Sequence, residues 1–235
     1  MTPNPGKGLV RLFALVPCAG VGARAGAGGP KQYVPIAGRA LVAHTLGALA
    51  GVRRLSQTLV VLAPDDTAFA AAAPHFEGWV AACGGDSRAA TVMAGLAELS
   101  RCGAGPHDWV LVHDAARCLL KPEWVDRLID ACLDDAVGGL LALPLADTLK
   151  SASGERVSAT VDRRDKWAAQ TPQMFRLGPL REALIAAGDA VTDESSAMEA
   201  LGLAPRLVMG SAHNLKITLP EDFALAQALM EAHRP

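Results

Sequence analysis

The chain has 235 residues and a formal net charge of −2, which fits one large α/β domain able to bury a sizeable core. The near-neutral charge argues against general binding to nucleic acid, and no apolar run reaches the length of a membrane span. Hydrophobic residues make up 51% of the chain and aromatic residues only 4%, so we expect an aliphatic, alanine-rich core.

Cysteine usage and the first residues bear on location. The five cysteines are an odd number without a CxxC pair, which favours neither a disulfide framework nor a zinc site. Residues 1–8 lack the long apolar segment of a signal peptide. We therefore expect a reduced, cytoplasmic setting. From the length of the chain we expect a single domain, residues 1–235.

The first predicted strand, residues 13–16, runs into a turn of small residues. Gly20 and Gly22 carry no Cβ, so the backbone there can approach a ligand closely. Successive N–H groups in such a turn can form a nest for an anion. Arg24 and Lys31 follow at close range and add positive charge. The segment predicts a site for a nucleoside triphosphate, with charge available to stabilise phosphoryl transfer.

This segment is not a common phosphate-binding motif. Lys31 is followed by Gln32 rather than by Ser or Thr, and the glycine spacing differs, which excludes a P-loop. Ala25 takes the place of the third glycine of a dinucleotide turn, a match that only the looser form of that motif allows. Such turns also rely on backbone and helix dipole to hold a pyrophosphate, not on inserted basic side chains.

Strand-like and helix-like segments then alternate. The predicted strands are residues 57–62, 79–82, 109–113 and 138–144, and the predicted helices are residues 40–49, 87–99 and 122–135. Residues 64–66 resemble a helix N-terminus. Repeated β-then-α order predicts an α/β fold: a Rossmann-like, mostly parallel twisted sheet with helices on both faces. Ligands in such sheets bind beyond the carboxyl ends of the strands.

Residues 145–167 interrupt the alternation. A turn at Ser153-Gly154 separates two short strand-like runs, which predicts a protruding β-hairpin arm. A hairpin of this size is only marginally stable alone, so we expect it to pack on another subunit or over the active site. The chain then returns through predicted helices at residues 179–187, 194–200 and 221–232, and predicted strands at residues 206–208 and 216–218.

Two polar clusters follow predicted strands. Residues 84–88 are either a turn in which Asp86 or Ser87 caps the next helix, or a glycine turn that admits a base or ribose, with the Thr91 hydroxyl nearby. In the second cluster, residues 113–117, Asp114 is suited to anchor Mg²⁺ and Arg117 to bind an anion bidentately. The alternative for this cluster is an exposed capping pair, and the first loop favours the functional interpretation.

Later polar residues are less specific alone. Arg163 could be a surface charge, and Thr171-Pro172 could be a turn. Residues 192–195 resemble an N-terminal helix cap. Lys216 stands in an otherwise apolar segment, where it faces either solvent or a phosphate.

In chain order, these motifs resemble those of the 2-C-methyl-D-erythritol 4-phosphate cytidylyltransferase family. The matching stretches are residues 17–24, 31–32, 84–88, 113–117, 147–148, 161–163, 171–173, 192–194 and 214–218. The first stretch alone indicates only the broad class of nucleotidyltransferases. The last five stretches narrow the resemblance to this family. Cys18, Thr91 and Cys118 depart from the usual residues by small or conservative changes.

The resemblance implies transfer of CMP from CTP to 2-C-methyl-D-erythritol 4-phosphate, with Mg²⁺, giving 4-diphosphocytidyl-2-C-methyl-D-erythritol and pyrophosphate in isoprenoid precursor biosynthesis. It implies that Arg24 and Lys31 are catalytic. The implied nucleotide-binding residues are Pro17, Cys18, Ala19, Gly20, Gly22, Gly84, Gly85, Asp86 and Thr91. The implied acceptor-binding residues are Asp114, Arg117, Thr148, Arg163, Thr171, Thr192 and Lys216, with Asp114 also a metal ligand. It also implies a homodimer in which the arm lends Thr148 and Arg163 to the partner's site, without nucleic acid or membrane as partner.

Three alternatives stay open at this point. A cytidylyltransferase for ribitol 5-phosphate or another sugar phosphate shares much of the pattern around residues 161–172. A nicotinamide-dependent dehydrogenase would need an acid after the second strand, which Asp65 and Asp66 could supply. It would also need a catalytic Tyr-x-x-x-Lys, and the single tyrosine, Tyr33, does not form one. A nucleotide sensor would bind CTP without releasing pyrophosphate.

Overall fold

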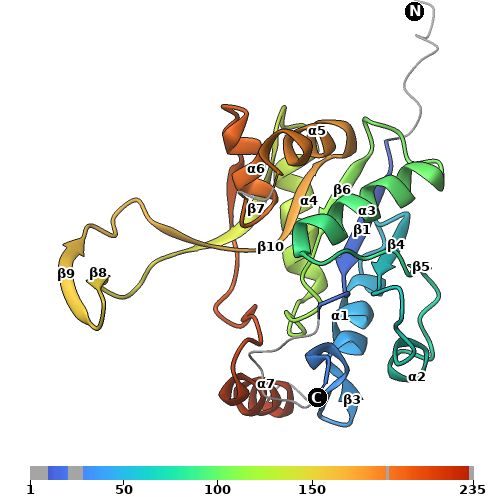
Figure 1. The fold of residues 1–235 in the computed structure, drawn as a ribbon, viewed down its shortest axis with the longest axis horizontal. Helices are drawn as coiled ribbons and strands as arrows, with labels where there is room; N and C mark the ends of the chain where they lie inside the picture. The colour runs from blue at the N-terminus through green and yellow to red at the C-terminus, as the bar shows by residue number, and fades with distance from the viewer. Residues whose placement is uncertain (1–9, 21–28, 189–190, 233–235) are drawn as a thin grey trace, which may run out of the picture.

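The computed structural model describes residues 10–20, 29–188 and 191–232, and its main feature is a seven-stranded sheet (Figure 1). The strand order is β11-β7-β10-β6-β1-β4-β5. These strands are β1 (Leu12–Pro17), β4 (Gln57–Val61), β5 (Trp79–Ala81), β6 (Trp109–Val112), β7 (Gly138–Pro144), β10 (Trp167–Arg176) and β11 (Arg206–Met209). All neighbouring strands pair in parallel except β10, which is antiparallel to β6 and β7.

Helices cover both faces of the sheet, as the alternating sequence pattern predicts. The helices are α1 (Leu41–Ala50), α2 (Phe69–Ala72), α3 (Arg88–Arg101), α4 (Pro122–Cys132), α5 (Leu177–Ala187), α6 (Glu194–Ala200) and α7 (Pro220–Ala232). In β1, Ala14 and Val16 pack in a core with α1 and α4, whereas Phe13 and Leu15 pack in a second core with α3, α5 and α6. Successive strand residues point to opposite faces, so this apolar strand supplies both cores.

Strand β10 is absent from the sequence-based prediction, although it lies in the middle of the sheet. Its register against β7 shifts between Ala169 and Gln173. Pro172 lies within that irregularity, where a residue without an N–H group costs no ladder hydrogen bond. A proline in the middle of a segment argues against a central strand, and a turn was one interpretation of Thr171-Pro172.

The hairpin arm is confirmed. Strands β8 (Leu149–Ser153) and β9 (Arg156–Val161) pair antiparallel around a turn at Gly154, whose φ of +58° suits glycine. Figure 1 shows the hairpin standing away from the body on the extended ends of β7 and β10. Nearly all of its residues are exposed. A two-stranded hairpin without a packing partner is marginally stable.

The predicted strand at residues 216–218 is wrong. This segment has no regular secondary structure, and a backbone hydrogen bond from Ile217 N to Ala116 O (2.9 Å) is one of its links to the body. Ile217 is buried in a third apolar cluster with Ile36, Cys118 and Ala226 of α7. The apolar residues that suggested a strand therefore serve as anchors for a loop, and the loop holds Lys216 at the edge of the sheet.

Smaller elements modify the predicted pattern near the first loop. Lys31–Tyr33 form a single-turn 3-10 helix, and β2 (Pro35–Ile36) and β3 (Arg39–Ala40) form a short hairpin. Helix α2 begins at Phe69, slightly after the predicted start, and Asp66 Oδ1 accepts from the N–H groups of Ala68 and Phe69. Among the helices described, none has the length and apolar composition needed to cross a bilayer.

Candidate active site

Three loops meet beyond the carboxyl ends of the central strands. The loop after β1 touches the loop after β5, because a Cβ built on Gly84 would lie 2.3 Å from the Cβ of Ala19. Only glycine allows that approach. The loop after β6 is held from below by Thr45 of α1, whose hydroxyl donates to Ala115 O (2.8 Å). The predicted nucleotide-binding loops are therefore adjacent, as expected at the end of a parallel sheet.

The predicted nucleotide-binding residues differ in how they are placed. Ala19 and Gly20 follow β1, and Gly85 and Asp86 are exposed ahead of α3. The Thr91 hydroxyl is buried and donates to Ser87 O (2.9 Å) and Gly85 O (3.2 Å), so in this structure it fixes the turn. Ser87 caps α3 by accepting from Ala90 N, as one interpretation of this turn predicted. Gly22 and Arg24 lie outside the described residues.

Lys31 lies beside the segment that carries Lys216. Its Nζ donates to Ile217 O at 2.6 Å, a contact that spans 186 positions of sequence. The side chain is half-buried. Two lysines far apart in the sequence are thus brought to the same end of the sheet.

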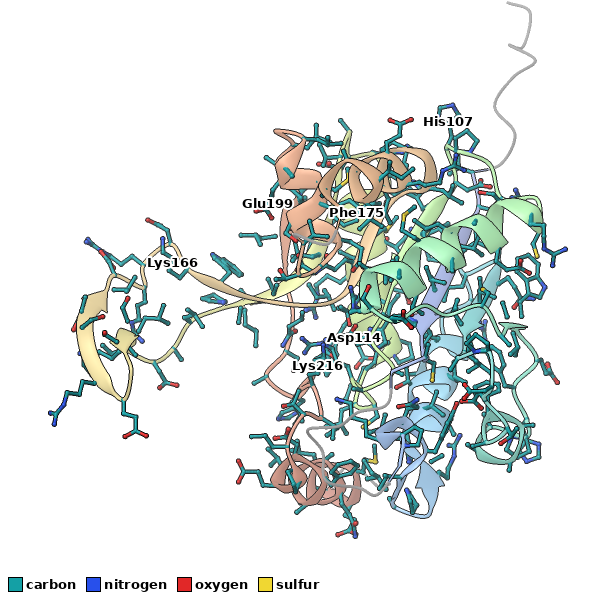
Figure 2. The ribbon with its side chains drawn as sticks, viewed as in Figure 1. His107, Asp114, Lys166, Phe175, Glu199 and Lys216 are labelled. Atoms are coloured by element: carbon teal, nitrogen blue, oxygen red, sulfur yellow. The ribbon has the colours of Figure 1, made fainter. Side chains whose placement is uncertain are left out.

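Asp114 is the centre of a charge cluster at this end (Figure 2). It is 7% exposed, and its oxygens accept from Arg88 Nε (2.8 Å) and Lys216 Nζ (2.7 Å). Burial alone would raise the pKa of Asp114, but the positive charges of Arg88 and Lys216 hold it well below its usual range. Asp114 is therefore an anion that orients two cations.

Arg88 also binds a second buried carboxylate. Its Nη1 and Nη2 donate to the two oxygens of Glu194 at 2.7 and 3.0 Å, and Glu194 is 1% exposed. Burial raises the pKa of Glu194 against the lowering effect of Arg88. Neither residue has a predicted role, because a contact across 106 positions leaves no spacing signal in the sequence. Arg88 ties the start of α3 to the start of α6.

Arg117 lies under this cluster and is itself buried. Its Nη1 donates to Asn214 O (2.6 Å) and its Nη2 to Ala169 O (3.3 Å). Its buried Nε has no hydrogen-bond partner among the residues described. The charge of Asp114 acts on this guanidinium, but the hydrogen bonds described for Arg117 go to neutral carbonyls rather than to a carboxylate. That arrangement suits the guanidinium to an anionic ligand.

Thr171 is buried next to the Asp114 cluster, and its hydroxyl contacts other protein groups. Its hydroxyl oxygen accepts from Asp114 N (3.1 Å) and lies 3.0 Å from His113 Nδ1. His113 is fully buried, and its burial lowers its pKa to about 4, so the ring is neutral near pH 7. Thr192 lies next to Asp193, which caps α6 in a capping box, as the sequence predicted for this segment.

The arm residues are not part of this cluster in the same subunit. Thr148 and Arg163 are exposed, and Figure 2 shows Lys166, on the projecting arm close to the hairpin, well away from Asp114 and Lys216. The sequence-based prediction placed both residues in the site of a partner. A role for Thr148 and Arg163 in the site of a partner subunit stays a prediction.

The donor set around Asp114 does not fit a magnesium ion held by the protein. Mg²⁺ binds several oxygen ligands, usually one or two carboxylates together with phosphates and water. Both oxygens of Asp114 already accept from cations. Within the described ranges, no group of three His, Cys, Asp or Glu side chains could hold a metal ion. The proposed role of Asp114 as a metal anchor gains no support from this geometry.

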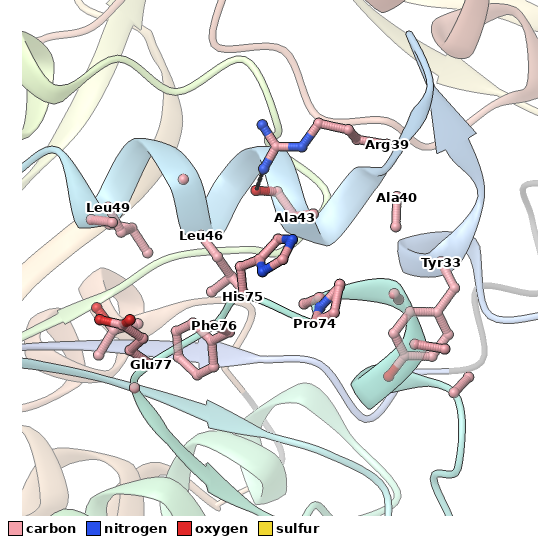
Figure 3. Close-up of a pocket in the computed structure, with 18 of the residues that line it drawn as sticks. Tyr33, Arg39, Ala40, Ala43, Leu46, Leu49, Pro74, His75, Phe76 and Glu77 are labelled. Carbon is pink, nitrogen blue, oxygen red and sulfur yellow. Dashed lines mark hydrogen bonds between the residues drawn. The ribbon is translucent and has the colours of Figure 1, made fainter.

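Two cavities help to locate the site. A cavity of about 610 Å³ is lined by residues 85–90 and 191–194 and adjoins the Arg88–Glu194 pair. A larger cavity of about 1080 Å³ lies between α1 and the segment after α2, where Tyr33, Arg39 and Phe76 line it (Figure 3). The larger cavity contains no member of the Asp114 cluster, so its size does not make it the active site.

Comparison with known proteins gives one consistent result. A sequence model of the family described as 2-C-methyl-D-erythritol 4-phosphate cytidylyltransferase matches residues 12–232. A protein of that name from Burkholderia cenocepacia is 54% identical, covering 94% of this chain and 96% of the relative. The bifunctional enzyme IspD/IspF of Albidiferax ferrireducens is 62% identical over 94% of this chain, which spans 53% of that relative's length.

Solved structures agree with the sequence relatives. A crystal structure of 4-diphosphocytidyl-2C-methyl-D-erythritol synthase is 43% identical, with a TM-score of 0.84 over 94% of this chain and 98% of the other. The 2-C-methyl-D-erythritol 4-phosphate cytidylyltransferase of Thermus thermophilus is 32% identical, with a TM-score of 0.77 over 94% of this chain and all of the other.

Proposed function

The chain belongs to the 2-C-methyl-D-erythritol 4-phosphate cytidylyltransferase family, and we infer that it transfers CMP from CTP to 2-C-methyl-D-erythritol 4-phosphate. The products are 4-diphosphocytidyl-2-C-methyl-D-erythritol and pyrophosphate, and the reaction belongs to isoprenoid precursor biosynthesis. One observation of the structure supports this most directly. Lys31, Arg88, Arg117 and Lys216 gather at the same end of the sheet. Arg88 and Lys216 pair there with the buried Asp114, and Arg88 also pairs with the buried Glu194.

The chemistry requires cations rather than a base. An oxygen of the acceptor phosphate attacks the α-phosphorus of CTP, a new P–O bond forms, and the bond to the leaving pyrophosphate breaks. The attacking oxygen is already an anion, so no proton has to be removed. The protein has to bring two polyanions together and stabilise the charge of the transition state. Lys31, and Arg24 by resemblance, would act on the α-phosphate.

We propose that the two substrates occupy different sides of the site. CTP would bind where Ala19 meets Gly84, with residues 84–86 next to the base and ribose. The acceptor phosphate would bind near Arg117 and Lys216, where the buried guanidinium lacks a carboxylate of its own. Thr171 and Thr192 would complete that side. Mg²⁺ would enter bound to the triphosphate, as part of the substrate, because the residues around Asp114 do not form a metal site.

The activity is tested by pyrophosphate release with CTP and a panel of acceptors. We expect fast release with 2-C-methyl-D-erythritol 4-phosphate and little with ribitol 5-phosphate or other sugar phosphates. Preference for ribitol 5-phosphate would assign the chain to the competing acceptor class. Binding of CTP without pyrophosphate release from any acceptor would favour a nucleotide sensor. Stabilisation against heat by NADH but not by CTP would support the dehydrogenase alternative.

We further propose that the chain acts as a homodimer through the arm. The hairpin is exposed along its length and has no packing partner within the described part of its own chain beyond the base of the arm. Packing on a second copy would supply the buried area that an isolated hairpin lacks. Thr148 and Arg163 would then reach the acceptor side of the partner's site. A cytoplasmic location also remains a proposal, supported by the phosphorylated substrates and by five free thiols.

Subunit mixing tests the shared site. Lys31→Ala and Arg163→Ala are each expected to be nearly inactive alone. In a mixed dimer, one site carries both defects and the other carries neither. Random exchange at equal concentrations should therefore restore about a quarter of the wild-type activity per site, since half of the dimers are mixed and each has one intact site.

Two further mixtures act as controls. Mixing Lys31→Ala with Lys216→Ala should recover no activity, because the two lysines belong to the site of the same chain. Every mixed dimer then has one defect in each of its two sites. Arg164→Ala, a neighbouring arm variant whose side chain pairs with Asp162, should stay active alone. Absence of recovery after verified exchange of Lys31→Ala and Arg163→Ala would count against a shared site.

A further inference from the structure

Gln32 makes an unusual contact with the loop after β1. This side chain is 6% exposed. Its Nε2 donates to Cys18 O and to Gly20 O, both at 3.0 Å. Because both partners are carbonyl oxygens, the amide nitrogen with its two N–H groups has to face them. One buried amide therefore binds two alternate carbonyls of the glycine-rich turn.

This contact fixes the direction of a backbone N–H group. In a trans peptide the carbonyl of one residue and the N–H of the next point in opposite directions. The Cys18 carbonyl faces Gln32, so the Ala19 N–H faces away from it. Cys18 N is already used by Val61 O (2.8 Å). Within the described part of the chain, the N–H groups of Ala19 and Gly20 donate to no protein acceptor.

The 3-10 turn that carries Gln32 explains why one residue can do this. Side chains in a 3-10 helix leave at intervals of about 120°, so three consecutive residues point in three directions. Lys31 reaches Ile217 O, Gln32 reaches the glycine-rich turn, and the Tyr33 hydroxyl donates to Asp66. The position of the lysine and the shape of the turn are therefore set by the same short helix.

We propose that Gln32 is a positioning residue for the nucleotide. It holds the carbonyls of Cys18 and Gly20 away from the triphosphate, so that the turn presents N–H groups, not carbonyl oxygens, to the phosphates. Without it, the peptide could rotate and place an oxygen dipole against a polyanion. Oriented N–H groups in such a turn bind anions. This inference rests on the proposed CTP-dependent function and adds a residue to it.

The alternative is that Gln32 only stabilises the fold. Satisfying two carbonyls would then contribute to stability and leave ligand affinity unchanged. The two roles differ in their effect on the two substrates. A purely structural residue would lower the melting temperature and leave CTP affinity and both Michaelis constants unchanged in the folded fraction. Replacing a positioning residue would weaken the binding of CTP and leave the Michaelis constant for the acceptor unchanged.

The test uses the full chain and three variants of Gln32. Gln32→Met keeps the length and removes both donors, Gln32→Glu places a carboxylate against the two carbonyls, and Gln32→Asn keeps a shorter amide. Gln227→Met, at an exposed position of α7, is the matched control. The measurements are the Kd for CTP by calorimetry, the Michaelis constants for both substrates, kcat and the melting temperature.

For Gln32→Met we expect the Kd and Michaelis constant for CTP to rise about tenfold, the effect of losing about 1.4 kcal/mol. The Michaelis constant for the acceptor should stay within about twofold of the wild-type value. Gln32→Glu should bind CTP more weakly than Gln32→Met does. Gln32→Asn tests the same selectivity if Gln32→Met does not fold. Unchanged CTP affinity in folded variants, or equal losses for both substrates, would overturn the proposal. Wild-type turnover is measured first, so failure of the proposed function itself would appear there, before any variant is compared.

Discussion

Replacing Lys31 with alanine is expected to lower turnover at saturating substrates by about 10²–10³-fold, equivalent to roughly 3–4 kcal/mol of transition-state stabilisation. The ammonium group would act on charge that grows as the α-phosphorus is attacked, so kcat should fall more than binding. The protein should remain folded. In the structure the Lys31 side chain is half-buried, and the hydrogen bond described for it is to a backbone carbonyl.

Two comparisons make this result interpretable. Lys31→Arg keeps the charge and should retain more turnover than Lys31→Ala. Arg181→Ala removes an exposed cation from α5 and should leave turnover unchanged, which controls for a general loss of positive charge. Melting temperatures report folding for all three. Near wild-type turnover of Lys31→Ala would remove this lysine from the mechanism.

The sheet was predictable because its strands carry a local signal. In β1 and β6 every side chain is apolar, and the helices between the strands have their own periodicity. Strand β10 has no such signal, since Pro172 interrupts it and Gln170, Thr171 and Gln173 are polar. Those polar residues are buried because they form hydrogen bonds with the loop after β6, with Ser211 and with the first turn of α6, all of which are distant in sequence. Buried strands are recognised in a sequence by their apolar residues. A strand whose buried side chains are polar and hydrogen-bonded is therefore overlooked.

The sequence predicted several residues of the site, but not the contacts that join them. Asp114, Arg117, Thr171 and Lys216 were singled out individually, and the structure brings them together. What joins them was not foreseen. Arg88 pairs with two carboxylates that lie 26 and 106 positions away. The strand predicted at Lys216 is a loop. Such contacts depend on the path of the chain between elements, which no local spacing encodes.

The pairing of Lys216 with Asp114 makes a second large effect testable. Lys216 Nζ lies 2.7 Å from Asp114 Oδ2, and the lysine side chain is 39% exposed while the aspartate is nearly buried. An incoming acceptor phosphate could reach the ammonium from the solvent side while the carboxylate holds it from below. In this arrangement the aspartate orients the lysine, and the lysine binds the substrate.

Lys216→Ala is therefore expected to lower kcat/KM for the acceptor by about 30-fold to several thousandfold, corresponding to about 2–5 kcal/mol for one cation removed from a phosphate clamp. The loss should appear as a higher Michaelis constant for the acceptor or a lower turnover. The affinity for CTP with Mg²⁺, measured alone by calorimetry, should barely change. Lys216→Arg should recover part of the loss.

Asp114→Asn separates the role of the lysine from that of its partner. If Asp114 acts by orienting Lys216, the double variant should be little worse than Lys216→Ala, because residues that act as a unit show non-additive effects. Fully additive losses would mean that Asp114 contacts a substrate independently. If Lys216→Ala instead abolishes CTP binding and leaves acceptor dependence intact, the lysine belongs to the nucleotide side. The division of the site proposed above would then have to be reversed at this residue, with Arg117 left as the anion-binding group on the acceptor side.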